Sequence, residues 1–533
     1  MGKKRELEPI SYELPYPSRR ALALGTSAVA SSHALASQAA LRVLDGGGNA
    51  VDAALAAAST LTVVEPTMNG LGGDLFALVW DGQALHGLNA SGRSPRGWSL
   101  ERFAGRERMP ELGWDAVTVP GAVSGWQALH HRFGSRPWPD LLSAAVEYAE
   151  DGFLVTPHVA ALWAEAPRRF AGFAEFARCF LPGGAAPKVG SRVRLADLGK
   201  SLREIAETAG ESFYRGALAA RIADCSHAEG GALDAADLAQ QRAIWVEPLS
   251  VDYAGVTLHE LPPNGQGLAT LLALAVLREL ELERFLPDAP DAVHLQVEAM
   301  KVALTACARY VADPDSMNVT AEQLLDSRNV RALAASIDPR HAREPAASPQ
   351  ADHGTVYVAA ADRAGRMVSL IQSNYLGFGS GVVVPGTGVS LQNRGLGFRL
   401  EPGHPSCVGG GKRPYHTIMP GFITREGDAE MAFGVIGGHM QPQGHVQLVL
   451  RSFLYGQNPQ AACDAPRWHV TEAQQLALEP AFADATRTEL ARRGHRLVEA
   501  PTLLFGGAQI VRRIGDGYCA ASDPRKDGQA VAS

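Results

Sequence analysis

The sequence has few cysteines, no long hydrophobic run and no excess of basic residues. Its six cysteines are far apart among 533 residues and form no Cys-x-x-Cys pair, which argues against a disulfide framework or a cysteine-based zinc site. We interpret them as reduced cysteines that are buried or inert. No stretch reaches the roughly 18 apolar residues of a membrane-spanning helix. With a net charge of −7 and scattered Lys and Arg, the chain carries no electrostatic footprint for nucleic acid or a membrane surface.

The N-terminus also lacks the apolar core of a secretory signal. Lys3, Lys4 and Arg5 are followed by acidic residues and prolines instead of an uninterrupted hydrophobic segment. This pattern predicts a cytoplasmic protein. A hydrophobic fraction of 46% and a charged fraction of 20% are typical of a globular chain with a sizeable core, so small-molecule chemistry is the better first hypothesis.

Two helices are predicted near the N-terminus. Residues 33–44 place apolar side chains on one face at helical spacing, and the glycines at 46–48 can end this helix. Asn49 is a suitable N-cap for a second helix that runs to about Val64. Because this second helix is apolar nearly all round, we expect it to be buried.

Further along, a glycine turn at residues 70–74 leads into an apolar run at 75–80, which predicts a buried strand. Helical patterns dominate from about residue 126 to 340. Within them, three charged residues on one amphipathic stretch favour a solvated, salt-bridged helix face. They are Glu298, Lys301 and Arg309.

The pattern changes after residues 342–352, which are rich in Ala, Pro and charge and read as an exposed linker. Residues 355–361 and 367–373, joined by a turn that contains Gly365, predict a β-hairpin. A second pair of strands is predicted at 416–422 and 430–436. The chain is thus helix-rich first and strand-rich last, without an internal repeat.

Thr355 begins the first strand of that hairpin, directly after Gly354 and the linker. A hydroxyl is a poor nucleophile unless a base takes its proton. A threonine at a chain terminus can use its own α-amine, whose pKa near 8 suits proton transfer close to neutral pH. Cleavage between Gly354 and Thr355 would create that terminus, and glycine tolerates the strained backbone that an N-to-O acyl shift needs. Taken alone, however, Thr355 also fits an ordinary strand-starting threonine.

Other residues fit the same hypothesis without proving it. Ser373 ends the second hairpin strand and is expected to lie beside Thr355. Gly437 and Gly438 follow an apolar strand and can expose backbone N–H groups to an oxyanion. Each of these features is also common in ordinary strands and turns.

Three other site types fit poorly. Residues 409–412 resemble part of a phosphate loop, but Arg413 replaces the required Ser or Thr. Residues 377–381 lack the last glycine and the helix of a dinucleotide fingerprint. The histidines of the C-terminal part lack the helical i, i+4 pairing of a zincin, so we expect no metal. They are His404, His416, His439 and His445.

Several separated motifs together resemble the γ-glutamyltranspeptidase (glutathione hydrolase) family, in the family's order from about residue 20 to 520. They are Gly47-Gly48-Asn49-Ala50-Val51-Asp52, Glu65-Pro66, Gly70-Leu71-Gly72-Gly73-Asp74, Val119-Pro120-Gly121, Tyr148-Ala149-Glu150-Asp151-Gly152-Phe153, Pro262-Pro263, Glu298 with Lys301, Gly437-Gly438 and Ala465-Pro466-Arg467. The stretch 372–381 is similar to a sub-branch near glutathione-hydrolase-like proteins and oxamate amidohydrolase.

The resemblance implies an α+β fold, the four-layer αββα sandwich of N-terminal-nucleophile hydrolases, with a helix-rich large chain and a strand-rich small chain. It implies a proenzyme that cleaves itself before Thr355. Residues 1–354 would form the large chain and residues 355–533 the small chain, both held in one folded domain. No cofactor is implied, and association into homo-oligomers is left open.

The resemblance also assigns roles to single residues. Ser373 takes the position that contacts the nucleophile's amine, and Gly437 and Gly438 take the oxyanion positions. The family's carboxylate-binding arginine falls on Ser91, and Arg93 is the expected substitute. A family aspartate that binds the substrate ammonium falls on Leu396. The remaining expected substrate-binding residues are Asn374, His416 and Thr417, with His416 as a possible cation for an acidic substrate.

These residues predict an enzyme that attacks γ-glutamyl amides such as glutathione through an acyl-enzyme on Thr355, with water or an amine as acceptor. Two alternatives stay open. One is an amidase of the same fold for another small acid amide, of the oxamate type, because Leu396 cannot pair an ammonium. The other is an unprocessed, non-catalytic binding protein.

Overall fold

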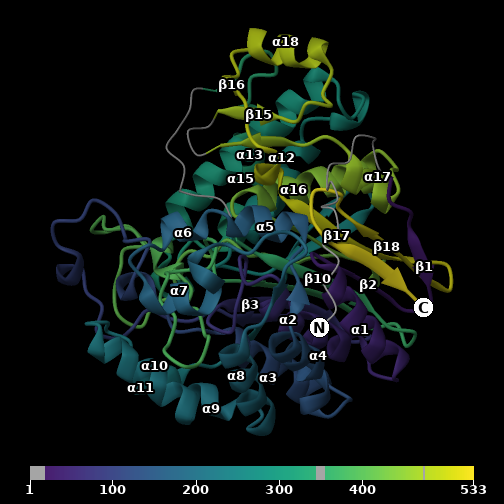
Figure 1. Cartoon of the computed structure of the whole chain (residues 1–533). Helices are drawn as coiled ribbons and strands as arrows, with labels where there is room; N and C mark the ends of the chain where they lie inside the picture. The colour runs from purple at the N-terminus through teal and green to yellow at the C-terminus, as the bar shows by residue number, and fades with distance from the viewer. Residues whose placement is uncertain (1–18, 344–353, 472–474) are drawn as a thin grey trace.

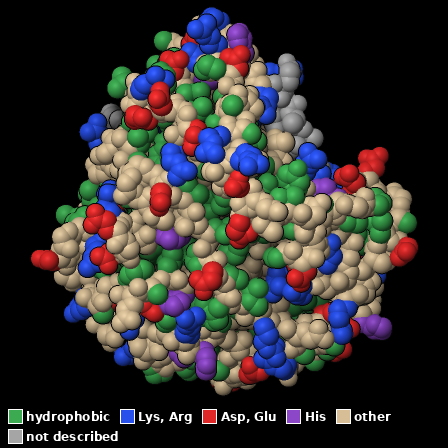
Figure 2. Space-filling view, turned by 180° about the vertical axis from the view of Figure 1, so that it is seen from behind, with side chains coloured by type: hydrophobic (Ala, Val, Ile, Leu, Met, Phe, Trp, Pro, Cys, Tyr) green, Lys and Arg blue, Asp and Glu red, His purple; other side chains and the backbone are tan. Residues whose placement is uncertain are grey.

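The computed structural model describes residues 19–343, 354–471 and 475–533. The N-terminal segment on which the cytoplasmic prediction rests, and linker residues 344–352, lie outside the described residues. Across the described ranges, no helix combines the length and the apolar character needed to cross a bilayer. All six cysteines are free thiols. Figure 2 shows acidic and basic side chains intermingled over one face of the molecule.

Two antiparallel sheets of seven strands each form the centre of the molecule (Figure 1). The first sheet has the order β1 (Ala23–Gly25), β18 (Gly517–Ser522), β17 (Gly507–Ile514), β13 (Asp428–Ile436), β12 (Gly421–Arg425), β9 (Val256–Glu260) and β8 (Leu249–Tyr253). The second has the order β19 (Gln529–Ala532), β2 (Ala28–Ser31), β10 (Val356–Ala361), β11 (Met367–Ser373), β3 (Asp74–Trp80), β4 (Leu85–Ala90) and β7 (Ile244–Val246). Smaller sheets join β14 (Trp468–Val470), β15 (Leu476–Leu478) and β16 (Leu497–Val498), and β5 (Phe153–Leu154) with β6 (Arg192–Val193).

Helices cover the outer face of each sheet. The second sheet is covered by α1 (Ala34–Asp45) and α2 (Ala50–Val64), with α3 (Ala122–Phe133), α4 (Trp138–Asp151) and α8 (Ala196–Glu207) beside them. The first sheet is covered by α12 (Gly267–Arg278) and α16 (Met440–Val449), with α13 (Pro290–Tyr310) behind α12. This is the predicted αββα sandwich. The remaining helices are α5 (Pro157–Trp163), α6 (Ala166–Arg169), α7 (Ala174–Phe180), α9 (Glu211–Arg215), α10 (Ala217–Ala228), α11 (Ala235–Gln240), α14 (Ala321–Leu324), α15 (Ser327–Ala335), α17 (Pro459–Asp464) and α18 (Asp484–Arg492).

The two N-terminal helices are confirmed, with the expected caps. The Asn49 side chain accepts hydrogen bonds from the backbone of Val51 and Asp52, and Asp52 returns a bond to the Asn49 N–H, which completes a capping box. Every residue of α2 is buried, as its uniform apolar character predicts. The buried strand predicted at 75–80 is β3, which begins one residue earlier at Asp74.

The predicted hairpin is also confirmed, since β10 and β11 pair antiparallel and Val356 lies opposite Gln372. Of the second predicted pair, β12 begins only at Gly421, because the backbone of His416 forms a single bridge to Gly265 instead of continuing the strand. Each of the two sheets contains strands from before and from after Gly354. The two parts of the chain therefore share both sheets.

The prediction of a solvated charged face on α13 is wrong for two of its three residues. Arg309 is exposed, but Glu298 and Lys301 are buried and form an ion pair with 2.9 Å between Lys301 Nζ and Glu298 Oε1. The cause is tertiary, because α13 lies between α12 and α18. Glu298 also accepts a hydrogen bond from the backbone N–H of Arg343, at the edge of the linker.

Removing the ammonium of Lys301 should therefore be costly. We expect Lys301→Met to lower the free energy of unfolding by about 3–5 kcal/mol, because it leaves the Glu298 carboxylate buried without its counter-charge. Urea denaturation measures the change. Arg309→Met on the exposed side of the same helix is the matched control and should change stability by no more than about 0.5 kcal/mol. Equal effects of the two variants would show that the buried pair carries no special weight.

Candidate active site

Thr355 lies at the start of β10, where the register of the hairpin places it opposite Ser373. Both residues are buried, and their hydroxyl oxygens are 3.4 Å apart. The predicted contact between Thr355 and Ser373 is therefore confirmed. The hydroxyl of Thr355 is also 2.7 Å from the carbonyl oxygen of Gly354, so it lies beside the peptide bond that precedes it.

Gly354 has a backbone that other residues adopt only with strain. Its φ is +113°, and a Cβ atom on it would lie 2.2 Å from the carbonyl oxygen of Tyr375. Its own carbonyl oxygen accepts a further hydrogen bond from the hydroxyl of Ser373. The carbonyl next to Thr355 is thus held in place and polarised by a hydroxyl donor.

A glutamine on α16 lies on the other side of Thr355. Gln441 Oε1 accepts from the backbone N–H of Met419, which directs its amide nitrogen to Thr355 Oγ1 at 3.5 Å. Gln441 follows the turn formed by Gly437 and Gly438, whose φ values are +121° and +53°. The start of α16 therefore brings Gln441, three residues after this glycine turn, next to Thr355.

Gln266 ties this glycine turn to a second segment of the site. Its amide nitrogen donates to the carbonyl oxygens of Thr417 and Gly438, at 2.5 and 2.9 Å. Gln266 is fully buried, so these bonds are shielded from water. Thr417 and the glycine turn consequently hold a fixed position relative to each other.

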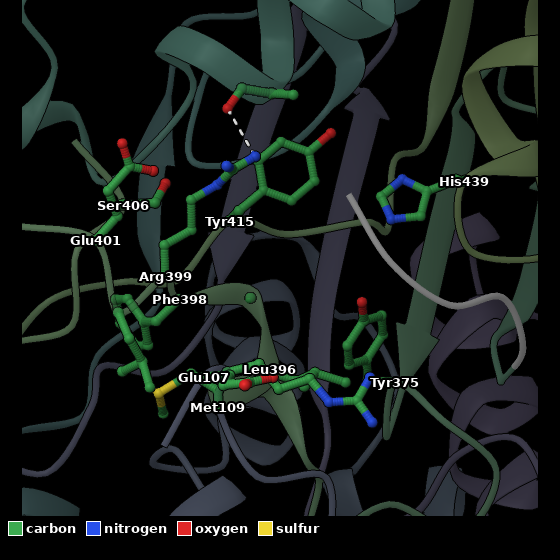
Figure 3. A pocket seen from close by; sticks show the side chains of 14 residues that line it. Glu107, Met109, Tyr375, Leu396, Phe398, Arg399, Glu401, Ser406, Tyr415 and His439 are labelled. Atoms are coloured by element: carbon green, nitrogen blue, oxygen red, sulfur yellow. Dashed lines mark hydrogen bonds between the residues drawn. The ribbon is translucent and has the colours of Figure 1, made fainter. Parts of the chain in front are cut away.

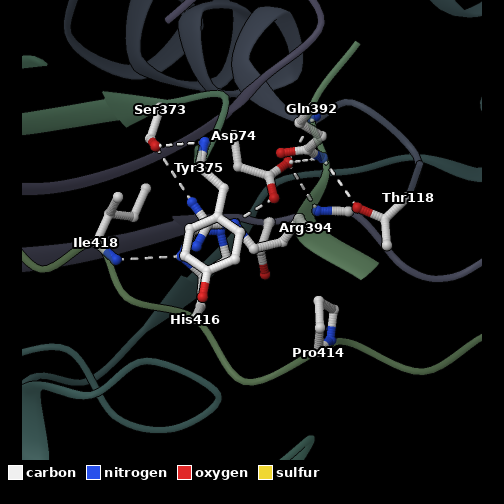
Figure 4. A network of polar contacts seen from close by, with 12 residues as sticks. Asp74, Thr118, Ser373, Tyr375, Gln392, Arg394, Pro414, His416 and Ile418 are labelled. Atoms are coloured by element: carbon white, nitrogen blue, oxygen red, sulfur yellow. Dashed lines mark hydrogen bonds and ion pairs between the residues drawn. The ribbon is translucent and has the colours of Figure 1, made fainter. Parts of the chain in front are cut away.

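A buried arginine joins Ser373 to Thr417 (Figure 4). Arg394 donates to the Thr417 hydroxyl at 2.8 Å and to the Ser373 hydroxyl at 3.2 Å. Its guanidinium lies 4.2 Å from the ring centre of Tyr375, a cation–π distance. Tyr375 has a φ of +78°, unusual for a residue with a side chain, and its N–H donates to Ser373. Burial lowers the pKa of Arg394 to about 10, which leaves it charged near neutral pH.

Asp74 and His416 form a second buried pair behind Arg394 (Figure 4). Asp74 accepts from two backbone N–H groups and from Gln392, and its other oxygen is 3.0 Å from His416 Nε2. The second ring nitrogen of His416 accepts from the N–H of Ile418 at 3.3 Å. Burial and the nearby Arg394 cation lower the pKa of His416 to about 4. His416 is thus a neutral imidazole with both nitrogens engaged, in contrast to the cation considered from the sequence.

Two predicted substrate-binding residues are engaged elsewhere. Arg93 forms an ion pair with Asp313 at 3.1 Å and donates to the carbonyl of Gly411 at 2.8 Å. Asn374 donates to the Ser390 hydroxyl at 3.0 Å. Among the contacts of the described residues, neither side chain reaches Thr355.

That cavity has a volume of about 390 Å³ and opens beside Tyr375 (Figure 3). Aromatic and apolar side chains make up much of its wall, with Tyr415 and His439 on one side and Leu396 near Tyr375. The cation Arg399 and the exposed carboxylates Glu107 and Glu401 also line it. The cavity can admit a small organic substrate.

One group in the described part of the chain has the spacing of a metal site, and it lies away from Thr355 on α13. The candidate ligand atoms of His294, Glu298 and His495 lie within 4.8 Å of one another. However, the two imidazoles hydrogen-bond to each other at 2.8 Å, and Lys301 already neutralises Glu298. These contacts favour a structural role.

Sequence reasoning missed Arg394, Asp74 and Gln441. Asp74 carried a signal, because a carboxylate that opens an apolar strand is seldom buried without partners. Arg394 ends a short polar run, residues 392–394, next to an apolar stretch. This pattern is a weaker signal of a buried polar residue. Gln441 carried none, because a glutamine in a helix is usually exposed.

Comparison with known proteins agrees with this geometry. The family model described as gamma-glutamyltranspeptidase matches residues 36–533. Among curated proteins, the glutathione hydrolase-like YwrD proenzyme of Bacillus subtilis is 36% identical over 515 residues, which cover 94% of this chain and 98% of that protein. The oxamate amidohydrolase proenzyme of Klebsiella pneumoniae is 38% identical over 520 residues, covering 94% and 97%.

Among solved structures, the cephalosporin acylase from Bacillus halodurans matches with a TM-score of 0.94 at 44% identity. The match covers 99% of both chains. The similarity to these proteins therefore spans the whole described fold, including both sheets and the site between them.

The neutral state of His416 predicts a pH dependence of stability. Its pKa falls from 6.5 to about 4 on folding. Between these values the unfolded chain binds a proton that the folded chain does not, so stability falls as the pH drops from about 6.5 to about 4. We expect His416→Gln to flatten this fall by up to about 1.4 kcal/mol per pH unit.

Urea midpoints measured from pH 7 to 4.5 test this expectation. His131→Gln, at an exposed position on α3, is the control and should keep the wild-type slope. If the stability of His416→Gln changes with pH as steeply as that of the control, His416 is not a neutral buried imidazole in the folded protein.

Proposed function

Because the chain belongs to the γ-glutamyltranspeptidase family of N-terminal-nucleophile hydrolases and transferases, we propose that it is a proenzyme that cleaves itself before Thr355 and then cleaves small amides. The observation that carries the proposal is the position of the Thr355 hydroxyl. It lies 2.7 Å from the Gly354 carbonyl oxygen, behind a glycine with positive φ and beside Ser373.

In the proposed self-cleavage, Thr355 Oγ1 attacks the carbonyl carbon of Gly354. The peptide C–N bond breaks, and the nitrogen takes the proton and becomes the α-amine of Thr355. Water then hydrolyses the ester, which leaves residues 1–354 and 355–533 as separate chains. Both proposed chains contribute strands to each of the two sheets, which supports their staying together as one domain.

In the proposed turnover, the new α-amine accepts the proton of Oγ1 as this oxygen attacks the substrate carbonyl. In this proposal Ser373 orients the amine, and the backbone N–H groups of Gly437 and Gly438 stabilise the oxyanion. The departing amine takes the proton. Water, or an acceptor amine, then releases the acyl group from Thr355.

For the substrate, we propose γ-glutamyl amides such as glutathione. The second candidate is an oxamate-type acid amide, and the observation that favours it is Leu396, which lines the cavity where an ammonium partner would be needed. Parallel assays of glutathione and oxamate hydrolysis separate these two substrates. A cytoplasmic location stays a prediction.

Thr355→Ala should abolish both self-cleavage and amide hydrolysis, because alanine lacks the attacking hydroxyl. On a denaturing gel, the wild type should convert from one band of 56.4 kDa to two bands, and the smaller chain should begin at Thr355 on N-terminal sequencing. Thr208→Ala, at an exposed helix end, is the control and should split like the wild type. A Thr355→Ala variant that still splits or still hydrolyses amides contradicts the assignment of the nucleophile. A wild type that never splits favours the non-catalytic alternative.

A further inference from the structure

Arg394 is a buried cation that contacts no carboxylate directly. Its side chain is fully inaccessible, and no carboxylate of the described residues lies within ion-pair distance of it. The nearby buried Asp74 raises the pKa of Arg394 but does not touch it. The Nε of Arg394 has no hydrogen-bond partner among the described residues either. Because a buried charge costs several kcal/mol unless it is well paired, the fold keeps this guanidinium with only neutral direct partners at some expense of stability.

Several other buried arginine side chains pair with a carboxylate, although Arg413 donates to the carbonyl oxygen of Ser91 instead. Arg467 pairs with Asp523 at 2.6 Å, and Arg525 pairs with Glu479 at 2.5 Å. Near the site, the partly exposed Arg93 also has a carboxylate partner, Asp313. Arg394 differs from these three paired arginines, because its partners are two neutral hydroxyls and an aromatic ring.

The position of Arg394 indicates which anion it would bind. Arg394 and the Gly354 carbonyl both contact the same Ser373 hydroxyl, so the guanidinium lies one hydroxyl away from the bond that Thr355 attacks. On its other side, Tyr375 lies over the guanidinium and also lines the cavity (Figure 4). Cleavage after Gly354 would release the Ser373 hydroxyl and leave Arg394 one hydroxyl away from the carbonyl of an incoming acyl donor.

We propose that Arg394, together with the Thr417 hydroxyl bonded to it, binds the carboxylate of the acyl donor, so that the enzyme selects monoamides of short dicarboxylic acids. This inference rests on the proposed function. The planar fork of a guanidinium matches a carboxylate, and a charge-assisted pair is stronger inside a buried site than in water. The short path from Arg394 to Thr355 through Ser373 limits the acid to a few carbons between its two carbonyl groups.

Two anilides that differ in one group test the proposal on the self-cleaved enzyme. Glutaryl-p-nitroanilide carries a terminal carboxylate, and pentanoyl-p-nitroanilide carries a methyl group in its place. For the wild type we expect kcat/KM for the glutaryl substrate to be larger by about ten-fold or more. In Arg394→Gln this ratio should fall close to one. If Arg394 had only a structural role, replacing it would lower kcat/KM for both anilides together and leave their ratio unchanged.

Three other variants sharpen the result. Arg394→Lys keeps the positive charge but lacks the planar guanidinium, so its ratio of kcat/KM for the two anilides should lie between those of the wild type and Arg394→Gln. Arg93→Gln tests the residue predicted from the sequence and should keep the wild-type ratio, because Arg93 is paired with Asp313. Arg168→Gln is the control at a side chain that is 86% exposed. The proposal is overturned if Arg93→Gln loses the preference for the glutaryl substrate and Arg394→Gln keeps it.

A measurement on the wild type covers the case in which the Arg394 variants do not fold. Hydrolysis of the glutaryl anilide by the self-cleaved wild type is measured with added glutarate or with added pentanamide, which has no carboxylate. We expect glutarate to compete with the substrate and pentanamide at the same concentration to have no effect. Equal inhibition by the two compounds, or none by glutarate, overturns the proposal.

Failure of this inference can be told from failure of the proposed function. A wild type that splits before Thr355 but hydrolyses neither anilide, or both equally well, refutes the carboxylate site and leaves self-cleavage standing. A wild type that does not split refutes the proposed function itself.

Discussion

The antiparallel register of three neighbouring strands sets the geometry of the site. Val356 pairs with Gln372, which places Thr355 opposite Ser373, and Ser373 pairs in turn with Asp74 on β3. Three polar residues therefore stand in one row across a sheet that is otherwise apolar at this point. A slip of one residue would turn the side chains of a strand to the opposite face. Because both faces of this sheet are buried, such a slip would expose core residues, and the packing of the sandwich thereby fixes the distance between the nucleophile and its neighbour.

Two buried charged side chains in or next to this row, Asp74 and Arg394, differ in the groups that stabilise their charge. Asp74 accepts hydrogen bonds from backbone N–H groups, Gln392 and His416, so its charge is fully solvated by protein groups. Arg394 has only neutral partners. A cation held near the nucleophile in a dry site also favours negative charge as it develops on the attacked carbonyl. In our proposal, the cost of burying Arg394 without a direct counter-charge and its attraction for an acidic acyl donor have the same physical origin.

The sequence specified the local elements well and the long-range contacts poorly. The caps of α2 and the β10–β11 hairpin depend on residues close together in the chain, so their pattern was visible. The burial of Glu298 and Lys301 depends on helices packed from distant segments, and amphipathic spacing alone could not reveal it. Likewise, Thr355 and Ser373 lie within one hairpin, whereas Arg394 comes from a separate loop and bonds both Ser373 and Thr417. The pairing of Thr355 with Ser373 was therefore predictable from the local pattern, whereas the contacts of Arg394 were not.

In the proposed reactions, self-cleavage and then turnover both use the hydroxyl of Ser373. In the intact chain the Ser373 hydroxyl is committed to the Gly354 carbonyl. Cleavage removes that acceptor and creates an amine on the residue that Ser373 already faces at 3.4 Å. Since a hydroxyl can rotate to a new partner without moving its backbone, β10 and β11 need not change their pairing between the two reactions. Cleavage then alters the connectivity of the chain and leaves its fold in place, so the intact chain already carries the arrangement that the enzyme would use.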